Sequence, residues 1–407
     1  MKHIAIAGAG PAGVATALLL ARQGMKVTLL EQERNFERVF RGEGLMPSGL
    51  AALHQMGLKE TFERTASRQL DAWDFYVGGR RRMRVVEPEK AGLATQIINQ
   101  GELLQAMVQQ AKQQPNFSFY PGWRVSELHR DTSQAVTGVR AAHEGQSKDF
   151  EVDAVIACDG RYSRLRKLAG LTMTQSPAQF DVLWFKLPAP ASLTEETPFV
   201  ACLQPERQFA FYPSWDGRLQ IGWIVEKISA QSGLASFKSR DWIEEFAQAL
   251  PPALAEHFRQ HKAALEGPIY LDVQVGCCPQ WSIPGLLLIG DAAHPMAPNR
   301  AQGINMALRD AIVVANHFAG LTNAGPVPVE TLQAIQAERQ PEVEAVQKMQ
   351  LAEWRKVDFI SRPGLPYQAF KAIATLFGRF PFAQNIWLHE QKGLREGVLP
   401  VQLYPTL

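Results

Sequence analysis

The sequence predicts an α/β fold in which a Rossmann-like dinucleotide-binding domain is combined with a second, strand-rich domain. Three observations lead to this prediction. A short apolar strand over 2–7 runs directly into the glycine-rich motif GAGPAG at 8–13 and then into a helical run. A second apolar segment, 25–30, ends on Glu31. Far downstream, the apolar segment 286–289 ends in the motif GDAAH at 290–294, which repeats the strand-then-turn pattern.

Each position of the GAGPAG motif has a physical role. Gly8 permits the tight turn after the strand, Gly10 lets the backbone approach a pyrophosphate, and Gly13 lets helix and strand pack closely. The helix N-terminus adds free N–H groups and a partial positive charge. A carboxylate at the end of the second strand can accept both hydroxyls of a ribose. The residues that we expect to bind the ADP half of a dinucleotide are Gly8, Gly10, Pro11, Ala12, Gly13 and Glu31.

Size and composition narrow the class of protein. A chain of 407 residues is long enough for two domains and a helical appendage. The net charge of +2 argues against a nucleic-acid partner, and no run of 18 apolar residues predicts a transmembrane segment. The four cysteines have no metal-ligand spacing, so we expect no metal site. The simplest interpretation is that they are reduced thiols in a cytoplasmic protein. We expect the protein to be a monomer or a homodimer.

The remaining elements follow from periodicity. Apolar residues recur at helical spacing over 47–57, whereas they alternate along 71–86 on either side of a Gly-Gly turn, which predicts a β-hairpin. Similar patterns predict helices over 101–113, 242–250, 252–261, 302–318 and 329–349, the last interrupted at Pro341. Further strands are expected over 117–120, 123–129, 135–142, 153–157, 182–187, 199–203, 208–212 and 219–225.

These elements predict two interleaved domains. We assign 1–70, 92–175 and 272–350 to the dinucleotide-binding domain, 71–91 and 176–271 to an inserted substrate-binding sheet domain, and 351–407 to a C-terminal helical segment packed on the body.

Three motifs occur in a recognisable order: GAGPAG at 8–13, Asp159-Gly160 after a strand, and Gly290-Asp291 after another. In this respect the chain resembles the class A flavoprotein monooxygenases, the single-component aromatic hydroxylases that include para-hydroxybenzoate hydroxylase and the ubiquinone-pathway hydroxylases. The resemblance extends from Lys2 to about Met349.

The resemblance implies FAD as the cofactor, with NADH or NADPH as a transient electron donor. It implies that Asp291 bonds the ribityl chain and that the 298–305 loop lies along the isoalloxazine. Free N–H groups at the start of the next helix would stabilise the reduced flavin. The positions matched to FAD contacts are Arg41, Gln100, Asp159, Asp291, Pro298, Gly303, Ile304 and Asn305. Asp159 could instead be a turn residue.

No residue is assigned to catalysis with certainty. Arg41 is matched beside the FAD, and His294 could relay a proton, although a structural role at its turn is the alternative. Arg300 stands where family members commonly have glycine, and it would bring a guanidinium near the flavin edge or the pyrophosphate. No arginine lies on the strand 209–213, which disfavours a small benzoate. Phe75, Trp184, Phe211 and Trp223 suggest an apolar substrate pocket, unless they are core residues.

The resemblance therefore implies hydroxylation or epoxidation of an aromatic or conjugated substrate by NAD(P)H and O2 through a flavin C4a-hydroperoxide. Three alternatives share the cofactor fold. A flavin-dependent reductase of the prenyl-reductase type would not consume oxygen. A flavin-dependent halogenase requires a Trp-x-Trp-x-Ile-Pro segment, which 222–226 does not match. A non-enzymatic protein of the GDP-dissociation-inhibitor fold should lack the 298–305 loop.

Overall fold

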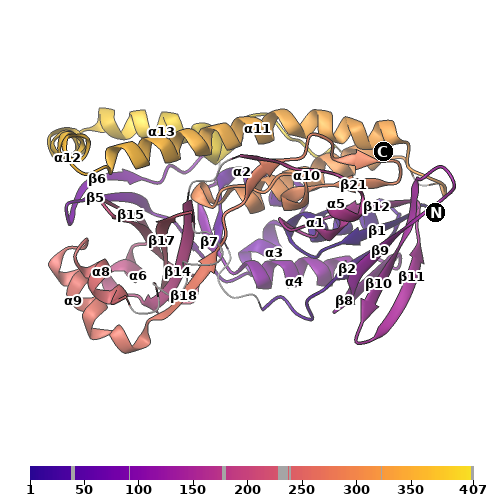
Figure 1. Cartoon of the computed structure of the whole chain (residues 1–407), viewed down its shortest axis with the longest axis horizontal. Helices are drawn as coiled ribbons and strands as arrows, with labels where there is room; N and C mark the ends of the chain where they lie inside the picture. The colour runs from indigo at the N-terminus through magenta and orange to yellow at the C-terminus, as the bar shows by residue number, and fades with distance from the viewer. Residues whose placement is uncertain are drawn as a thin grey trace.

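The computed structural model describes residues 1–37, 42–90, 92–176, 180–227, 237, 240–321 and 323–404. It confirms the α/β fold. Figure 1 shows two sheet-containing bodies side by side, with long helices of the C-terminal part lying across both of them.

The dinucleotide-binding body is built on a six-stranded sheet. Its order is β20 (Ser282–Ile283), β21 (Leu286–Leu288), β12 (Ala154–Ala157), β1 (His3–Ala7), β2 (Lys26–Glu31) and β8 (Phe117–Pro121). All neighbouring strands are parallel except β20 and β21. The central strands are apolar and buried on both faces, as parallel strands covered by helices should be.

Helices and small sheets surround these strands. The helices are α1 (Pro11–Arg22), α2 (Pro47–Gln55), α3 (Lys59–Glu63), α4 (Gln100–Ala111), α5 (Arg164–Leu168) and α10 (Gln302–Phe318). Three small sheets accompany them: β11 (Gln146–Glu151), β10 (Val136–His143) and β9 (Arg124–Arg130); β3 (Gly44–Leu45), β7 (Gln96–Ile98) and β4 (Ser67–Gln69); and β13 (Thr174–Ser176) with β19 (Val275–Cys277). The largest apolar core lies between the six-stranded sheet and α1, α4 and α10.

The second body is a seven-stranded sheet. Its order is β18 (Glu266–Leu271), β14 (Phe180–Pro188), β17 (Arg218–Glu226), β16 (Arg207–Pro213), β15 (Pro198–Gln204), β5 (Ala72–Val77) and β6 (Arg80–Val86). One face is covered by α8 (Trp242–Ala247) and α9 (Pro252–Gln260), which form a second core with it, and α6 (Ala191–Glu195) precedes β15. The opposite face, here named the inner face, contacts the C-terminal helices.

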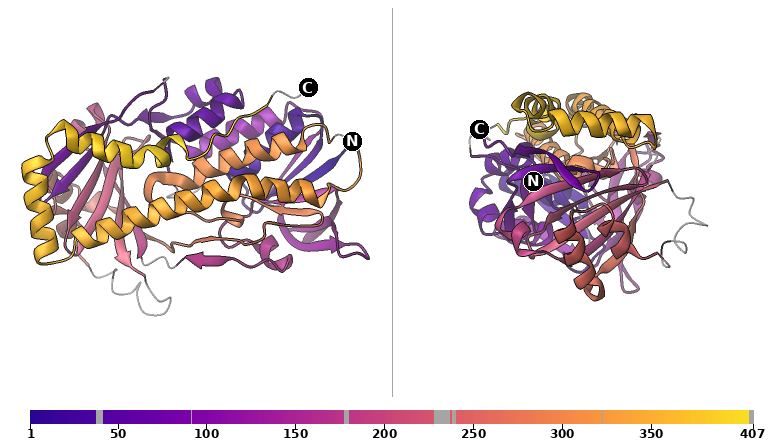
Figure 2. Two further views of the ribbon diagram at one scale, coloured as in Figure 1. Left: turned by 90° about the horizontal axis from the view of Figure 1, so that it is seen from above. Right: turned by 90° about the vertical axis from the view of Figure 1, so that its left-hand side faces the viewer.

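The C-terminal helices are α11 (Val329–Ile360), α12 (Leu365–Phe377) and α13 (Pro381–Glu396). Figure 2 shows α11 running along the length of the molecule and α12 crossing its end. The predicted interruption at Pro341 is wrong, because α11 continues through it. Proline removes one backbone hydrogen bond, and buried ion pairs hold this turn against α10: Arg339 with Asp310 at 2.8 Å, and Arg309 with Glu342 at 2.6 Å.

No helix in the described part of the chain combines the length and the apolar character that a membrane crossing requires.

Candidate functional site

The glycine-rich loop has the geometry of a phosphate site. Gly8 has a φ of +100° and donates its N–H to the Leu30 carbonyl at 2.7 Å, which ties the turn to the second strand. A Cβ on Gly13 would lie 1.9 Å from the Gly8 oxygen, so only glycine permits this approach of α1. A Cβ on Gly10 would meet nothing within 4 Å. The space at the N-terminus of α1 is therefore open to a pyrophosphate, and the residues fit an FAD at this position.

Glu31 is held at the edge of this loop. Its carboxylate accepts the Ala9 N–H at 2.6 Å and the Glu33 N–H at 2.9 Å. The side chain is almost fully buried at the end of β2. These two backbone donors fix the position of the carboxylate beside the glycine-rich loop.

A buried polar network centred on Asp310 of α10 holds the Gly290-Asp291 turn. The backbone N–H of Gly290 donates to Asp310 at 3.0 Å, and the His294 imidazole is 2.7 Å from the same carboxylate. Burial by itself raises the pKa of Asp310, but His294 and Arg339 outweigh it and bring the pKa to about 2. Because His294 is 1% exposed and bound to Asp310, the structure favours the structural role over the proton relay.

The start of α10 lies beside Asp291. A Cβ on Gly303 would be 3.8 Å from the Asp291 carboxylate and would meet nothing closer. The side chain of Asn305 turns inward, where it accepts the Met46 N–H at 2.9 Å and donates to the Ala301 carbonyl at 2.6 Å. It thereby fastens the 298–305 loop to β3 and α2.

The other predicted cofactor residues lie in different settings. Asp159 accepts from the Ser163 hydroxyl at 2.5 Å and the Leu165 N–H at 3.0 Å, so it stabilises the turn into α5. Gln100 is the first residue of α4 and is half-buried. Arg41 lies outside the described residues.

Arg300, which the sequence led us to expect near the flavin edge or the pyrophosphate, is bound by a carboxylate of α11 and by two aromatic rings. Its backbone is left-handed, with a φ of +60°. Its guanidinium bonds Glu353 of α11 at 2.8 Å and contacts two neighbouring rings, those of Trp73 and Trp387, at 4.7 and 4.9 Å from their centroids. The side chain therefore joins the 298–305 loop to the sheet and to the C-terminal helices, because a carboxylate and two aromatic faces attract it there.

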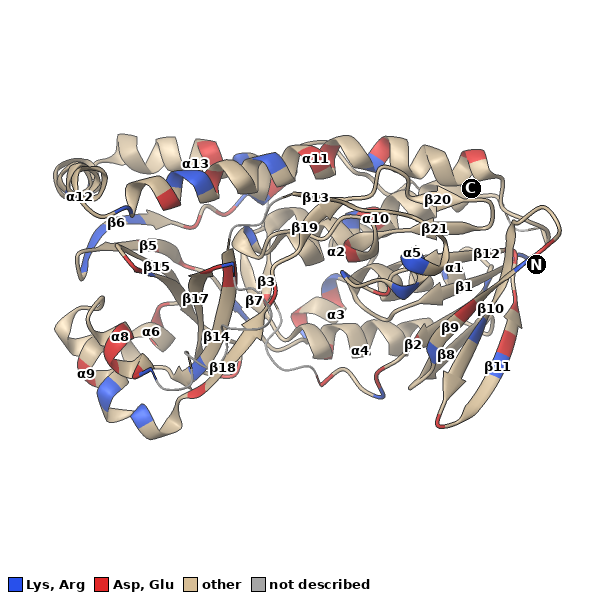
Figure 3. Ribbon diagram, viewed as in Figure 1, with Lys and Arg blue, Asp and Glu red and all other residues tan. Residues whose placement is uncertain are grey.

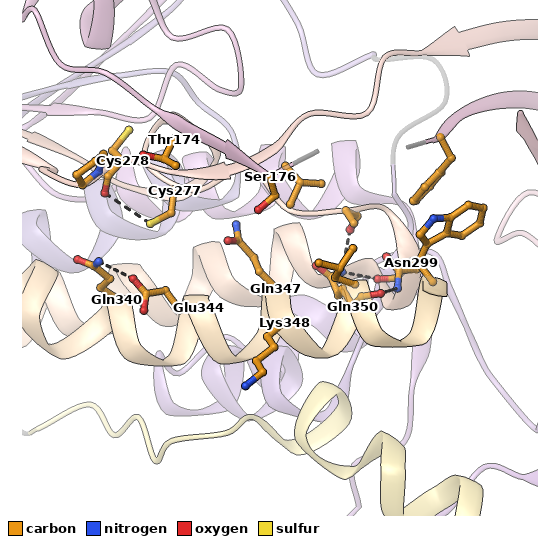
Figure 4. A pocket seen from close by; sticks show the side chains of 16 residues that line it. Thr174, Ser176, Cys277, Cys278, Asn299, Gln340, Glu344, Gln347, Lys348 and Gln350 are labelled. Atoms are coloured by element: carbon orange, nitrogen blue, oxygen red, sulfur yellow. Dashed lines mark hydrogen bonds between the residues drawn. The ribbon is translucent and has the colours of Figure 1, made fainter. Parts of the chain in front are cut away.

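Amide side chains of α11 also hold this region. Gln350 donates to the carbonyls of Ala297 and Asn299 at 2.9 and 2.6 Å, and Gln347 donates to the Pro295 carbonyl at 3.2 Å. Gln347, Gln350 and Asn299 line a cavity of about 470 Å³ between α11 and the β13–β19 ribbon (Figure 4). The long helix thus supports this segment through hydrogen bonds to its backbone carbonyls.

The two faces of the seven-stranded sheet separate the four aromatic residues predicted for the substrate pocket. Phe211 and Trp223 pack into the core with α8 and α9 and are at most 2% exposed, so for these two the pocket prediction is wrong. Phe75 and Trp184 lie on the inner face. Side chains alternate across a strand, and the periodicity alone did not reveal which face the helices cover.

Glu43 is a site residue that the sequence did not single out. Its carboxylate accepts the Ser214 hydroxyl at 2.8 Å and lies 3.9 Å from the Lys186 ammonium. Burial raises its pKa to about 7, against the partial opposition of Ser214 and Lys186. Lys186 lies closer to Asp216, at 2.6 Å, and therefore does little to stabilise the ionised form of Glu43. The available signal was a glutamate between two glycines, Gly42 and Gly44, just ahead of the predicted helix 47–57.

Comparison with known proteins places this arrangement in a family. Residues 1–350 match the model of the FAD binding domain. The 6-methylpretetramide 4-monooxygenase of Streptomyces rimosus is 32% identical over 362 residues, covering 86% of this chain and 83% of that protein. The phenazine 1,6-dicarboxylic acid hydroxylase of Lysobacter antibioticus is 27% identical, covering 84% and 88%.

A solved structure has the same fold. The p-nitrophenol 4-monooxygenase of Pseudomonas putida superposes with a TM-score of 0.80 and 18% identity over 98% of this chain and 100% of that one. The chain belongs to the FAD binding domain family, within the class A FAD-dependent aromatic monooxygenases. It is an FAD-dependent monooxygenase, which confirms the family and the FAD expected from the three motifs.

Proposed function

We propose that the protein uses NADH or NADPH, O2 and bound FAD to hydroxylate or epoxidise a polycyclic aromatic or conjugated molecule in the cytoplasm. When bound, FAD would carry electrons from the nicotinamide to O2, so that one oxygen atom of O2 enters the substrate and the other leaves as water. The observation that carries the proposal is the position of the 298–305 loop. It is fastened on one side to the dinucleotide-binding body through Asn305 and on the other to the inner face of the sheet through Arg300.

The FAD contacts follow from the same geometry. The loop at Gly8 and Gly10 and the N-terminus of α1 would hold the pyrophosphate, and Glu31 the adenosine ribose. Asp291 would hold the ribityl chain. The N–H groups at Gly303 and Ile304 would favour the anionic reduced ring, because fixed donors at a helix start need no reorganisation.

The substrate would lie between the 298–305 loop and the inner face, in the domain assigned to 71–91 and 176–271. Two features favour a large aromatic molecule over a small benzoate. The inner-face positions of the central hairpin are Ala210, Tyr212, Gln220 and Gly222, none of them cationic. Two relatives are named for polycyclic aromatic substrates, 6-methylpretetramide and phenazine 1,6-dicarboxylic acid.

The buried Glu43 would hold or accept a proton at the edge of this site. Its segment touches the loop directly, since a Cβ on Gly44 would be 2.7 Å from the Ala301 methyl group. With a pKa near 7, a carboxyl can exchange a proton with a phenolic substrate at neutral pH.

The test is a substrate screen with the FAD-loaded protein. A true substrate should accelerate flavin reduction by NADH or NADPH, and ¹⁸O2 should label the product with one oxygen atom. Turnover of NAD(P)H with reduction of an organic acceptor and no oxygen consumption would replace the proposal by the reductase alternative.

A further inference from the structure

The end of the molecule formed by the last turn of α11, by α12 and by the start of α13 exposes a group of large apolar side chains, here named the apolar end. Its members are Phe359, Leu365, Ile373, Leu376, Phe377, Phe380, Phe382 and Ile386, each between 45% and 85% exposed. Scattered exposed apolar residues are ordinary, but a contiguous group of this size usually marks an interaction surface. Figure 2 shows α12 at the extremity of the molecule, away from the dinucleotide-binding body.

The apolar end is held rigidly in this position. Tyr367, on the opposite side of α12, is 7% exposed and packs with Val77 and Leu203 of the seven-stranded sheet. A Cβ on Gly378 would lie 2.5 Å from the Arg82 carbonyl, so the turn after α12 also abuts the β5–β6 hairpin. Because α12 is anchored through one face, its other face cannot fold back onto the body.

The aromatic residues at the turn form one cluster. The ring centroids of Phe377, Phe380 and Phe382 lie 6.0 to 6.4 Å apart in all three pairs. A compact group of exposed rings beside an amphipathic helix is typical of segments that insert into the headgroup region of a bilayer.

Cations outnumber acids along the segment of the apolar end. Residues 359–389 include Arg362, Lys371 and Arg379 but no aspartate or glutamate. Arg362 bonds Asp358 at 2.7 Å, and Lys371 lies against Gly78 of the β5–β6 turn, on the same side of α12 as Tyr367. The neighbouring hairpin adds the run RRRMR at 80–84, and Figure 3 shows this strand in blue beside α12. Two of those arginines are engaged, Arg81 with Asp74 and Arg84 with Glu196.

Apolar side chains surrounded by cations complement an anionic lipid surface. A second copy of the chain would fit less well, because a twofold contact brings the same surface of each copy together and would place cations against cations. The 13-residue α12 is only about 20 Å long, which suits a helix lying in the interface better than one crossing it.

We propose that the apolar end docks the protein on the surface of an anionic lipid bilayer, with α12 lying in the plane of the headgroups. The three phenylalanines reach below the phosphates while Arg379 contacts them. Docking is independent of the activity, because it uses no residue of the cofactor site.

The experiment is cosedimentation of the full-length, FAD-loaded protein with vesicles. Binding to vesicles of phosphatidylcholine with phosphatidylglycerol should exceed binding to phosphatidylcholine alone, and added salt should weaken it. The double variant Leu376→Ser, Phe380→Ser should reduce the bound fraction roughly tenfold or more. The control Ile269→Ser removes an exposed apolar side chain at the other edge of the same sheet and should bind as the wild type does.

The charge-reversal variant Arg379→Glu supplies a second test that does not depend on the apolar substitutions folding. It should weaken binding to the phosphatidylglycerol vesicles and leave FAD occupancy and the melting temperature unchanged. Failure of the wild type to sediment with either vesicle overturns the proposal. So does a dimer, measured by light scattering, that the serine variant converts to a monomer, because the occupant would then be a second copy.

Discussion

The buried carboxyl of Glu43 makes a quantitative prediction about stability and pH. In the folded protein its pKa is raised from 4.5 to about 7, chiefly by burial. Between these two values the native state retains a proton that the unfolded chain releases. The free energy of unfolding should therefore fall as pH rises through this window and should level off above about pH 7.

The size of the effect follows from the shift. At roughly 1.4 kcal/mol per pH unit, a displacement from 4.5 to about 7 corresponds to about 3 kcal/mol of lost stability on the alkaline side. Glu43→Gln keeps the shape and one acceptor for Ser214 but cannot ionise. The variant should be close to the wild type in acid and more stable by about 2–3 kcal/mol above neutrality.

The assay is urea unfolding of the FAD-loaded proteins near pH 5 and near pH 8, with Glu33→Gln as the control. Glu33 is an exposed carboxylate in the segment after β2 and does not contact this cluster. Groups around Glu43 that share its environment are Lys186, Tyr212, Ser214, Trp215 and Asp216. If Glu43→Gln and the wild type change in parallel between the two pH values, then Glu43 titrates as an ordinary carboxyl and the argument from burial fails.

Three further predictions concern Glu31, Gly303 and Arg300. Glu31→Ala should weaken FAD binding by on the order of 1.5–3 kcal/mol in a flavin titration, because a charge-assisted acceptor is lost; unchanged affinity would contradict its place beside the ribose. Gly303→Val should lower the reduction potential of the bound flavin and slow its reduction by NAD(P)H, whereas an unshifted potential in a redox titration would leave Gly303 as a packing residue only. Arg300→Gly should be more stable than Arg300→Ala by roughly 1 kcal/mol, because both lose the guanidinium but only glycine adopts the φ of +60° without strain. Equal melting temperatures for the two variants would show that the backbone there is unstrained.

Much of the cofactor side was predictable because its motifs are local. In GAGPAG the turn, the phosphate approach and the helix packing each depend on residues within one short segment, and Gly8 and Gly13 show the predicted geometry. The position of Glu31 at the end of β2 was also predictable, because the apolar segment 25–30 stops immediately before it. The order of three such motifs was enough to identify the family and FAD.

Only the tertiary structure decided which side chains face the site. Alternation placed Phe211 and Phe75 on strands, but the packing of α8 and α9 determined which face became core. Arg300 bonds Glu353, which is more than 50 residues away in the sequence. Glu43 bonds Ser214, which lies in the turn after β16 in the other body. The helix α11 continues through Pro341, where the ion pair of Arg339 with Asp310 of α10 holds the turn in place despite the lost backbone hydrogen bond. These outcomes depend on contacts between segments distant in sequence, and local periodicity carries no information about such contacts.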